Sequence, residues 1–426
     1  MIIEFYTMML LMAVVWPLLL AIPALQSRLP WPRYLALTPA VVLLTLPNDI
    51  SIKLPWLLYG TGFALDGNSR WILGAFIVIW FAAATLTFSA KQKPALKYSS
   101  TFYLLTMAGN LGALLTTDLV GFFVFSTLMS YGFYGLVIQD GDKTFQRAGR
   151  LYLYFLIAAD LALFEALLLM AFTTNNFQYE IARQAMSTMS ASPIYPYMVL
   201  IGFSLKAGIW PFYFWLSTAL HSCSRTVALF LVGGPITISL VGLIRWLPAR
   251  EDIHIMGIVM QVLGAAAILH FILRLFLAGK NRFSISWFII ASTGLFSLVL
   301  GTMLVNSSWP QHAYIAYPFI ASVSILFTIV ILIFGKNIKQ LDSPSTAPYF
   351  ITNILDRFNT WIKTAQQSVS KLKHRTINLW DNAVAIVVRK FASVSGDHKI
   401  KHFVTDWKIN ITLFLILILA FAWLAN

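Results

Sequence analysis

Long apolar runs are the sequence feature that most limits how this chain can fold. Runs of about 20 predominantly apolar residues recur along it, and each is long enough for an α-helix to cross the hydrocarbon core of a bilayer. Hydrophobic residues make up 59% of the 426 residues and charged residues only 11%, which excludes an ordinary soluble globular protein. The sequence therefore predicts an all-α polytopic membrane protein.

The apolar runs predict about twelve membrane helices. They lie at about 5–25, 34–46, 70–90, 100–117, 119–138, 149–173, 196–220, 227–247, 255–278, 284–305, 313–335 and 409–425. Lys and Arg gather in alternate connections, so these connections are expected in the cytoplasm and both termini outside it. The first run lacks a basic leader and a cleavage site, so we expect it to stay as a helix. The expected location is a bacterial inner (plasma) membrane.

Composition also limits the chemistry. The lone cysteine, Cys223, excludes a disulfide framework and a cysteine metal site. A net charge of +14 is explained by basic connections on one side of a membrane, so no nucleic-acid partner is expected. The sequence has no phosphate-binding loop, no closely spaced metal-ligand set and no nucleophile triad. We therefore expect no cofactor, no metal and no self-contained active site.

The stretch from Gly202 to Leu216 places a lysine and a proline inside an apolar segment. A charge at bilayer depth costs about 2.5–3.5 kcal/mol or more, so Lys206 is expected to face the bundle interior or a water-filled path and to mark a functional site. Pro211 removes a backbone donor and interrupts a helix. The pair predicts a broken helix around a buried lysine. In the alternative, Lys206 extends to the membrane surface and Pro211 serves packing alone.

The same stretch carries a family resemblance. Leu205-Lys-Ala-Gly-Ile-Trp-Pro-Phe-Tyr-Phe-Trp-Leu216 resembles the K-A-G-x-x-P-L-H-F-W-L-P segment of the antiporter-like subunits of respiratory complex I, membrane-bound hydrogenases and multi-subunit sodium/proton antiporters. Leu57–Arg70, with its alternation and glycines, resembles the short extracytoplasmic hairpin that leads into the family core. Val227 and Gly242–Arg245 fall at the spacing of the family's next helix, and the resemblance covers about residues 55–300.

The resemblance implies a proton path, with departures. Family members have two inverted repeats with broken helices and pass protons along buried Lys, Glu and His side chains, and Lys206 falls on the first broken-helix lysine. In Phe123-Val-Phe-Ser126-Thr127-Leu-Met-Ser130, Thr127 replaces the family glutamate. Thr237 stands about where a lysine or histidine is frequent, and Tyr213 replaces a histidine. The family's carboxylate partner for the lysine is therefore absent from its usual place.

Two acids in the predicted helix at 149–173 can compensate. Asp160 and Glu165 are five residues apart, which turns them roughly 140° from each other, so both cannot share one narrow face. A carboxylate within about 4–6 Å favours the charged form of a lysine, so one of the two is the candidate partner of Lys206. Asp160 is preferred because its surroundings resemble a family aspartate. Alternatively, each acid meets a cation such as Arg245 for assembly alone.

A further candidate for the proton path lies in the predicted helix at 255–278. His270 and Arg274 are four residues apart and share one face, with Gln261 about two and a half turns earlier. Arg274 is close enough to the helix end to reach the membrane surface. His270 is therefore kept as a relay candidate.

The resemblance weakens beyond residue 300, because no second K-A-G-like element follows. The predicted divisions are N-terminal membrane helices at 1–54, an antiporter-like core at 55–305, an additional membrane helix at 306–339, a linker and lateral helix at 340–400, and a membrane anchor at 401–426. Apolar residues at helical spacing between basic residues at about 350–395 predict an amphipathic helix on the cytoplasmic surface, with a reach of roughly 70 Å. It either lies across a neighbouring subunit or contacts lipid alone.

The sequence therefore favours a proton-conducting antiporter-like subunit of a multi-subunit redox-driven or ion-translocating complex, with a half-channel centred on Lys206. A proton-translocating NADH/quinone oxidoreductase or a membrane hydrogenase would be such a complex. The expected partners are other membrane subunits, lipid, and protons or sodium ions. Two alternatives stay open: a non-conducting structural subunit, and a membrane subunit of an ion-coupled inorganic-carbon uptake system.

Overall fold

The computed structural model describes most of the first 334 residues. The described residues are 2–26, 28–29, 31–46, 49–58, 60–89, 99–138, 143–174, 176–188, 194–213, 215–216, 219–220, 225–248, 253–277, 285–306 and 309–334. All belong to one compact unit, Met1–Pro344. The lateral helix predicted at about 350–395 and the anchor predicted at 409–425 lie outside the described residues. The total of twelve membrane helices therefore stays a prediction.

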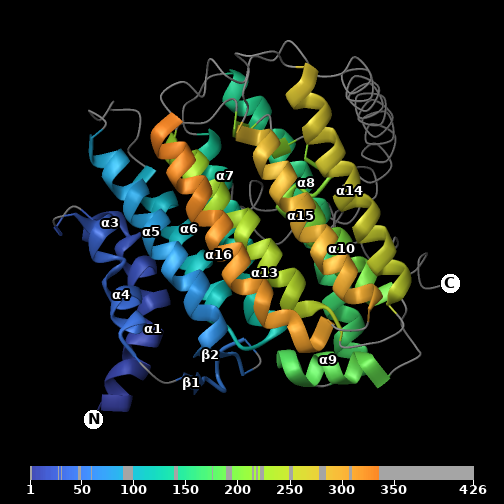
Figure 1. Ribbon diagram of the computed structural model, residues 1–426. Helices are drawn as coiled ribbons and strands as arrows, with labels where there is room; N and C mark the ends of the chain where they lie inside the picture. The colour runs from blue at the N-terminus through green and yellow to red at the C-terminus, as the bar shows by residue number, and fades with distance from the viewer. Residues whose placement is uncertain are drawn as a thin grey trace, which may run out of the picture. The chain divides into compact units, whose positions relative to one another are not determined.

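Helices make up nearly all of the described chain (Figure 1). Their bounds are α1 Ile2–Leu20, α2 Pro23–Gln26, α3 Pro32–Leu35, α4 Thr38–Leu44, α5 Gly67–Ser89, α6 Ser99–Leu115, α7 Leu119–Ile138, α8 Lys143–Thr173, α9 Tyr179–Thr188, α10 Ile194–Ala207, α12 Arg225–Leu231, the π-helix η2 Val232–Ile236, α13 Thr237–Trp246, α14 His254–Leu277, α15 Ile285–Val305 and α16 Trp309–Phe334. Seven helices among the described residues are long and apolar enough to cross a membrane, and four shorter ones are apolar. The expected polytopic membrane fold is therefore confirmed in its class.

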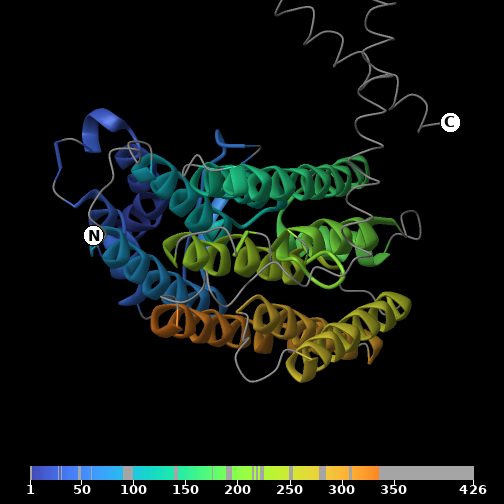
Figure 2. The same cartoon turned by 90° about the horizontal axis from the view of Figure 1, so that it is seen from above.

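The helices that carry the candidate residues form three layers, seen from above in Figure 2. One outer layer holds α7 and α8, the middle layer holds α10 and α12–α13, and the other outer layer holds α14, α15 and α16. The span Thr226–Trp246 in the middle layer is completely buried, whereas only 28% of the span His254–Leu273 is buried. Polar groups of the middle layer are thus shielded from lipid by protein on both sides.

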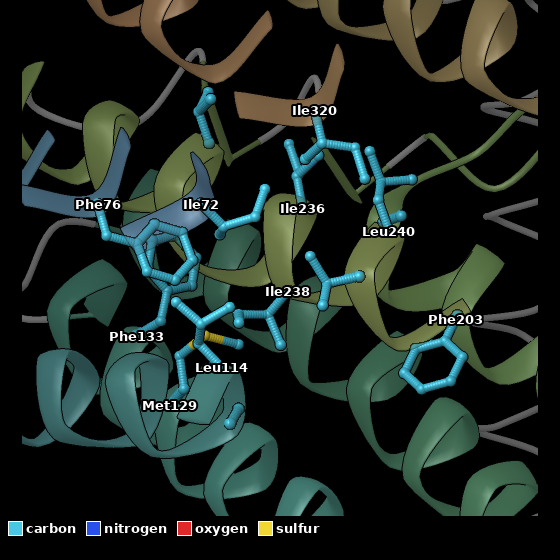
Figure 3. Packing of buried hydrophobic residues seen from close by; sticks show 14 of the residues in the cluster. Ile72, Phe76, Leu114, Met129, Phe133, Phe203, Ile236, Ile238, Leu240 and Ile320 are labelled. Atoms are coloured by element: carbon cyan, nitrogen blue, oxygen red, sulfur yellow. The ribbon is translucent and has the colours of Figure 1, made fainter. Parts of the chain in front are cut away.

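Apolar side chains fill the space between the layers. Figure 3 shows Phe76 of α5, Leu114 of α6 and Met129 of α7 packed around Ile238 of α13. Each of these side chains is essentially fully buried. Lipid tails are themselves apolar, so membrane helices gain little free energy by moving apolar surface out of lipid. The close packing of these side chains therefore stabilises the bundle.

The predicted hairpin is present, with its first strand earlier than expected. Strands β1 (Ile50–Lys53) and β2 (Gly62–Leu65) are antiparallel, and Ile50 pairs with Leu65. The predicted hairpin segment begins at Leu57, but a turn lies there instead. In this turn, Gly60 N–H and Thr61 N–H both donate to the Leu57 carbonyl. The hairpin leads into α5 as expected.

The helix predicted at 227–247 is interrupted, which the sequence analysis missed. It consists of α12, the π-helix η2 and α13. Pro235 lies within η2 and has no backbone N–H, so the regular hydrogen-bond pattern cannot pass through it. A π-turn of this kind leaves carbonyl oxygens for side chains to bind. The Gly233 carbonyl accepts a bond from Asn110 Nδ2 at 3.0 Å.

Candidate functional site

The helix that carries Lys206 ends one residue after it. α10 stops at Ala207, and Gly208 has φ 64°, a left-handed conformation that favours glycine. The Trp215 indole N–H then donates to the Leu205 carbonyl at 2.9 Å, which satisfies an acceptor near the helix end. The predicted broken helix is therefore present, with Pro211 in the non-helical segment that follows it.

Lys206 forms a buried ion pair with Asp160. Its Nζ lies 2.7 Å from Asp160 Oδ1, and the two side chains are 3% and 12% exposed. Lys206 Nζ also donates to Ser126 Oγ at 3.4 Å. Lys206 is therefore enclosed by α7, α8 and α10, and a carboxylate from α8 balances its charge. The alternative in which Lys206 extends to the membrane surface does not fit this burial.

A glycine allows α10 to approach α8 at this level. A side-chain Cβ at Gly202 would lie 2.6 Å from Leu163 Cγ and 3.2 Å from the Ala159 carbonyl. Any larger residue would push the two helices apart one turn before Lys206. Gly202 therefore helps to set the short distance between the ammonium and the carboxylate of Asp160.

The residues at the positions of the family tryptophan and glutamate have different surroundings. Ser126 contacts Lys206, whereas Thr127 Oγ1 is buried without a hydrogen-bond partner in the described part of the chain. Asp160 Oδ2 and Ser204 Oγ are also buried without hydrogen bonds among the described residues. Unsatisfied buried oxygens are rare in protein interiors. The carboxylate at Lys206 thus comes from α8 instead of α7.

The structure does not bring Glu165 into this pair. Glu165 is half-buried on α8, and no ion pair reaches it within the residues that the structure describes. Its position five residues after Asp160 turns it away from Lys206, as the helical geometry requires. Neither acid forms an ion pair with Arg245 in that part of the chain.

His270 lies on the other side of the broken helix. Its ring is 5.2 Å from the Tyr213 ring, centroid to centroid, and is half-buried on α14. Tyr213 belongs to the segment that follows Gly208, so α14 places an imidazole beside the interruption. Gln261 is half-buried on the same helix, and the side chain of Arg274 lies outside the described residues.

A second buried cation lies near the hairpin. The Arg245 guanidinium donates to Ser69 Oγ at 2.9 Å and to the Ala113 carbonyl at 3.2 Å, and it lies 5.3 Å from the Tyr179 ring. Sequence reasoning gave Arg245 no such role. At the start of α7, Asp118 caps the helix by accepting the Gly121 N–H at 2.7 Å.

Burial raises the pKa of the Asp118 carboxyl above its ordinary value, and the bonds from Gly121 N–H and the Thr61 hydroxyl act in the opposite direction. Asp118 lies between α6 and α7, outside the spanning segments. Its second oxygen has no hydrogen-bond partner among the described residues. Within those residues, no group of three or more His, Cys, Asp and Glu side chains could hold a metal ion.

The chain resembles antiporter-like membrane proteins. The expected family resemblance is confirmed, because residues 116–279 match the family described as NADH:quinone oxidoreductase/Mrp antiporter, transmembrane. This match includes every candidate residue of the proton path. These residues are Lys206, Asp160, Glu165 and His270, together with Pro211 of the broken helix.

One curated relative is named as a chain of a quinone oxidoreductase, and another is named as a subunit of an antiporter. NAD(P)H-quinone oxidoreductase chain 4 1 of Synechococcus sp. (strain JA-3-3Ab) is 29% identical over 282 residues, which are 60% of this chain and 53% of that protein. A probable K(+)/H(+) antiporter subunit of Rhizobium meliloti (strain 1021) is 29% identical over 175 residues, which are 40% of this chain and 32% of that protein. The chain thus spans about half or less of the length of these relatives.

Solved structures show the same fold. A chain of the Mrp complex from Dietzia sp. DQ12-45-1b aligns with a TM-score of 0.62 and 20% identity, covering 79% of this chain and 64% of that one. A chain of the membrane-bound sulfane sulfur reductase (MBS), an archaeal respiratory membrane complex, aligns with a TM-score of 0.59 and 18% identity, covering 76% of this chain and 57% of that one.

Proposed function

We propose that the protein conducts protons as a membrane subunit of a multi-subunit ion-translocating or redox-driven complex, and that Lys206 is the group that carries the proton. The observation that supports this most is the ion pair of Lys206 with Asp160, 2.7 Å apart and buried at the end of a broken helix. Two charges in an apolar interior are costly, so they are usually retained for a functional reason.

The pair has the chemistry that proton transfer needs. A lysine ammonium releases its proton when the balance of burial and neighbouring charge shifts, and a carboxylate close to it favours the charged form. Asp160 supplies that carboxylate from α8, whereas relatives of this family supply it from the position of Thr127. The segment after Gly208 is not helical, so its backbone can move without unwinding α10.

His270 extends the proposed path toward α14. The imidazole lies against Tyr213, in the segment that directly follows the lysine helix. Histidine changes its charge near neutral pH, which suits a group that hands protons on. Glu165 stays a weaker candidate, because it lies on a different face of α8 from the pair.

The setting of the protein follows from its relatives. One of them is named as a chain of a quinone oxidoreductase and another as a subunit of a K(+)/H(+) antiporter. The name of the antiporter relative includes protons, so we propose protons as the ion that this chain carries. A bacterial inner membrane, with both termini outside the cytoplasm, belongs to the same proposal and rests on the alternation of basic connections.

Replacement of the lysine tests the proposal. In Lys206→Ala, proton transport by membrane vesicles that contain the native complex should fall by roughly 100-fold, the scale of a lost proton-transfer group. Co-purification of the other subunits should be unchanged. Lys53→Ala is the matched control, because this lysine is exposed on β1. A fully assembled Lys206→Ala complex with normal transport would contradict the proposal.

A second candidate function is that of a structural subunit that does not conduct protons. Its supporting observation is the loss of ionisable groups at two family positions, Thr127 and Thr237. The Thr237 hydroxyl is instead bonded to the Val232 carbonyl at 2.6 Å. Normal transport in the assembled Lys206→Ala complex would separate this function from the first.

A further inference from the structure

The side chain of Asn110, on α6, is completely buried and bonds to three neighbouring elements. Trp80 Nε1 of α5 donates to Asn110 Oδ1 at 2.9 Å. Asn110 Nδ2 donates to the Gly233 carbonyl of η2 at 3.0 Å and to Met129 Sδ of α7 at 3.6 Å. One side chain therefore joins α5, η2 and α7 to α6, and the proposed proton path does not include it.

The partners of Asn110 fix the orientation of its amide group. An indole N–H can only donate, so the amide oxygen must face Trp80. A carbonyl oxygen can only accept, so the amide nitrogen must face Gly233. Asn110 thus uses its acceptor and its donor at the same time, and an apolar residue would supply neither.

The Gly233 carbonyl lacks its usual helical partner. In a regular α-helix it would accept the N–H of Thr237, four residues later. In η2, the Thr237 N–H bonds instead to the carbonyls of Val232 and Gly234. An unpaired carbonyl in the interior of a membrane protein is costly, so Asn110 supplies the bond that the π-helix removes.

Close packing of α6 against α7 makes Asn110 a firm attachment point. A Cβ at Gly109 would lie 2.4 Å from the backbone nitrogen of Met129 and 2.6 Å from the Phe125 carbonyl. The backbones of the two helices are therefore in direct contact beside Asn110. A side chain that projects from α6 at this level binds η2 at a set distance from α7.

Both of these elements also adjoin the lysine. Ser126, three residues before Met129 on α7, accepts the bond from Lys206 at 3.4 Å. η2 packs against α10, the helix that ends one residue after Lys206. We propose that Asn110 is a positioning residue, which binds the π-helix against α7 and thereby sets the surroundings of the Lys206 ammonium. Its bond to η2 stands on the hydrogen-bond geometry alone, and its effect on transport rests on the proposed function.

A structure of the native complex that carries Asn110→Leu tests the attachment of η2 without any transport measurement. Leucine branches at the same atom as asparagine but neither donates nor accepts, so the Gly233 carbonyl loses its bond. We expect η2 to change its backbone hydrogen bonds, and Lys206 Nζ to lie farther than 3.4 Å from Ser126 Oγ. An unchanged η2 would overturn the proposal.

Tyr103→Phe is the matched control on the same helix. It removes a buried hydrogen bond of 2.9 Å from Tyr103 to the Trp80 carbonyl, which belongs to the α-helix α5 and not to the π-helix. This variant should lower the thermal stability of the complex without moving η2 or slowing transport. A transport defect as large as that of Asn110→Leu would show that loss of any buried bond from α6 slows transport, and would overturn the positioning role.

Transport by the assembled complex tests the effect on the lysine. Asn110→Leu should slow proton transport by about tenfold, the result of a misplaced reacting group. Because a positioning residue acts through Lys206, Asn110→Leu should slow transport no further when it is added to Lys206→Ala. General destabilisation would instead add to the defect, so additional slowing in the double variant would overturn the positioning role.

Trp80→Phe replaces Asn110→Leu if the latter prevents assembly. It keeps a ring against Phe230 and removes the indole N–H that orients the amide, so transport should again be slow, and a normal rate would overturn the proposal. Normal transport in Asn110→Leu with slow transport in Lys206→Ala would overturn the positioning role and leave the proposed function intact. Normal transport in Lys206→Ala would overturn the proposed function, and the structure of Asn110→Leu would still decide whether Asn110 holds the π-helix in place.

Discussion

Among the residues that the structure describes, two cations are buried, Lys206 and Arg245, and their partners differ in kind. Lys206 lies 2.7 Å from the Asp160 carboxylate, at the end of a broken helix. Arg245 has no ion pair in the described part of the chain, and it donates instead to Ser69 Oγ and to the Ala113 carbonyl. One cation has a single charged partner, and the other has several neutral ones.

This difference indicates which cation can change its charge. An ammonium gives up its proton readily when its surroundings change, whereas a guanidinium stays protonated under all ordinary conditions. The partners of Arg245 come from α5 and α6, so the guanidinium joins these helices to α13 as a permanent charge. The partner of Lys206 is itself ionisable. The proposed function therefore gives proton transfer to the lysine, and we propose structural support as the role of the arginine.

Exchanging the two cation types should have the largest effect. Lys206→Arg keeps a positive charge beside Asp160 but cannot release a proton, so transport should fall by roughly 100-fold. Arg245→Lys should leave the transport rate of the assembled complex unchanged and lower its thermal stability, because an ammonium cannot reproduce the planar fork of bonds. Vesicle transport assays and thermal unfolding of the purified complex measure the two effects. If the two variants transported protons at the same rate and unfolded at the same temperature, the proposed difference in role between Lys206 and Arg245 would be wrong.

Loss of the carboxylate should have the next largest effect. Asp160→Asn leaves the lysine without a counter-charge, which costs about 3–5 kcal/mol for a charged buried group. We expect transport slower by about tenfold or more, with the other subunits still bound. Glu165→Gln is the comparison variant on the same helix and should slow transport much less than Asp160→Asn does. Normal transport in both variants and in the double variant would refute the hypothesis that a carboxylate of α8 replaces the glutamate missing at Thr127.

Much of the lysine site could be predicted because its signal is local. A lysine and a proline inside an apolar run are visible in the sequence, and so is the broken helix that they produce. Asp160 could be named as a candidate because few charges occur in apolar helices. The resemblance to a family aspartate favoured Asp160 over Glu165, and the contact itself depends on the packing of α8 against α10 at Gly202.

Other features depend on contacts that the sequence does not display. The sequence offered Arg245 only as an alternative partner for Asp160 or Glu165, yet it is buried through partners 176 and 132 residues away in the chain. The π-helix around Pro235 and the hydroxyl pair of Thr237 with Ser324 likewise join distant segments. Single polar residues in apolar helices are common, so these sites can be recognised only from the contacts that the side chains make in the folded structure.

A change at Gly202 should have a moderate effect on the lysine alone. In Gly202→Ala the new methyl group would meet Leu163 and the Ala159 carbonyl, and such overpacking costs about 1–3 kcal/mol. Separation of α10 from α8 would lengthen the contact between Lys206 and Asp160. Proton transport should therefore slow by a few-fold.

Gly74→Ala is the matched control for that variant. No atom lies within 4 Å of a Cβ built at Gly74, which also belongs to a membrane helix. Its transport and thermal stability should be normal. If both glycine variants transport protons at the same rate, the close approach of α10 and α8 does not set the geometry of the pair.

The smallest expected effects come from two buried serines, one beside each cation. Ser69 Oγ accepts a bond from Arg245 at 2.9 Å, whereas the bond from Lys206 to Ser126 Oγ is long, at 3.4 Å. A short bond to a charged group contributes about 1.5–3 kcal/mol, so Ser69→Ala should lower the thermal midpoint of the complex without slowing transport. Ser126→Ala should scarcely change that midpoint, because Asp160 still balances the lysine charge, but it should slow transport slightly through the altered surroundings of the ammonium. The two midpoints and two transport rates, measured on the same preparations, sharpen the contrast between a structural cation and a proton-carrying one. A larger loss of stability in Ser126→Ala than in Ser69→Ala would reverse the assignment of the two roles.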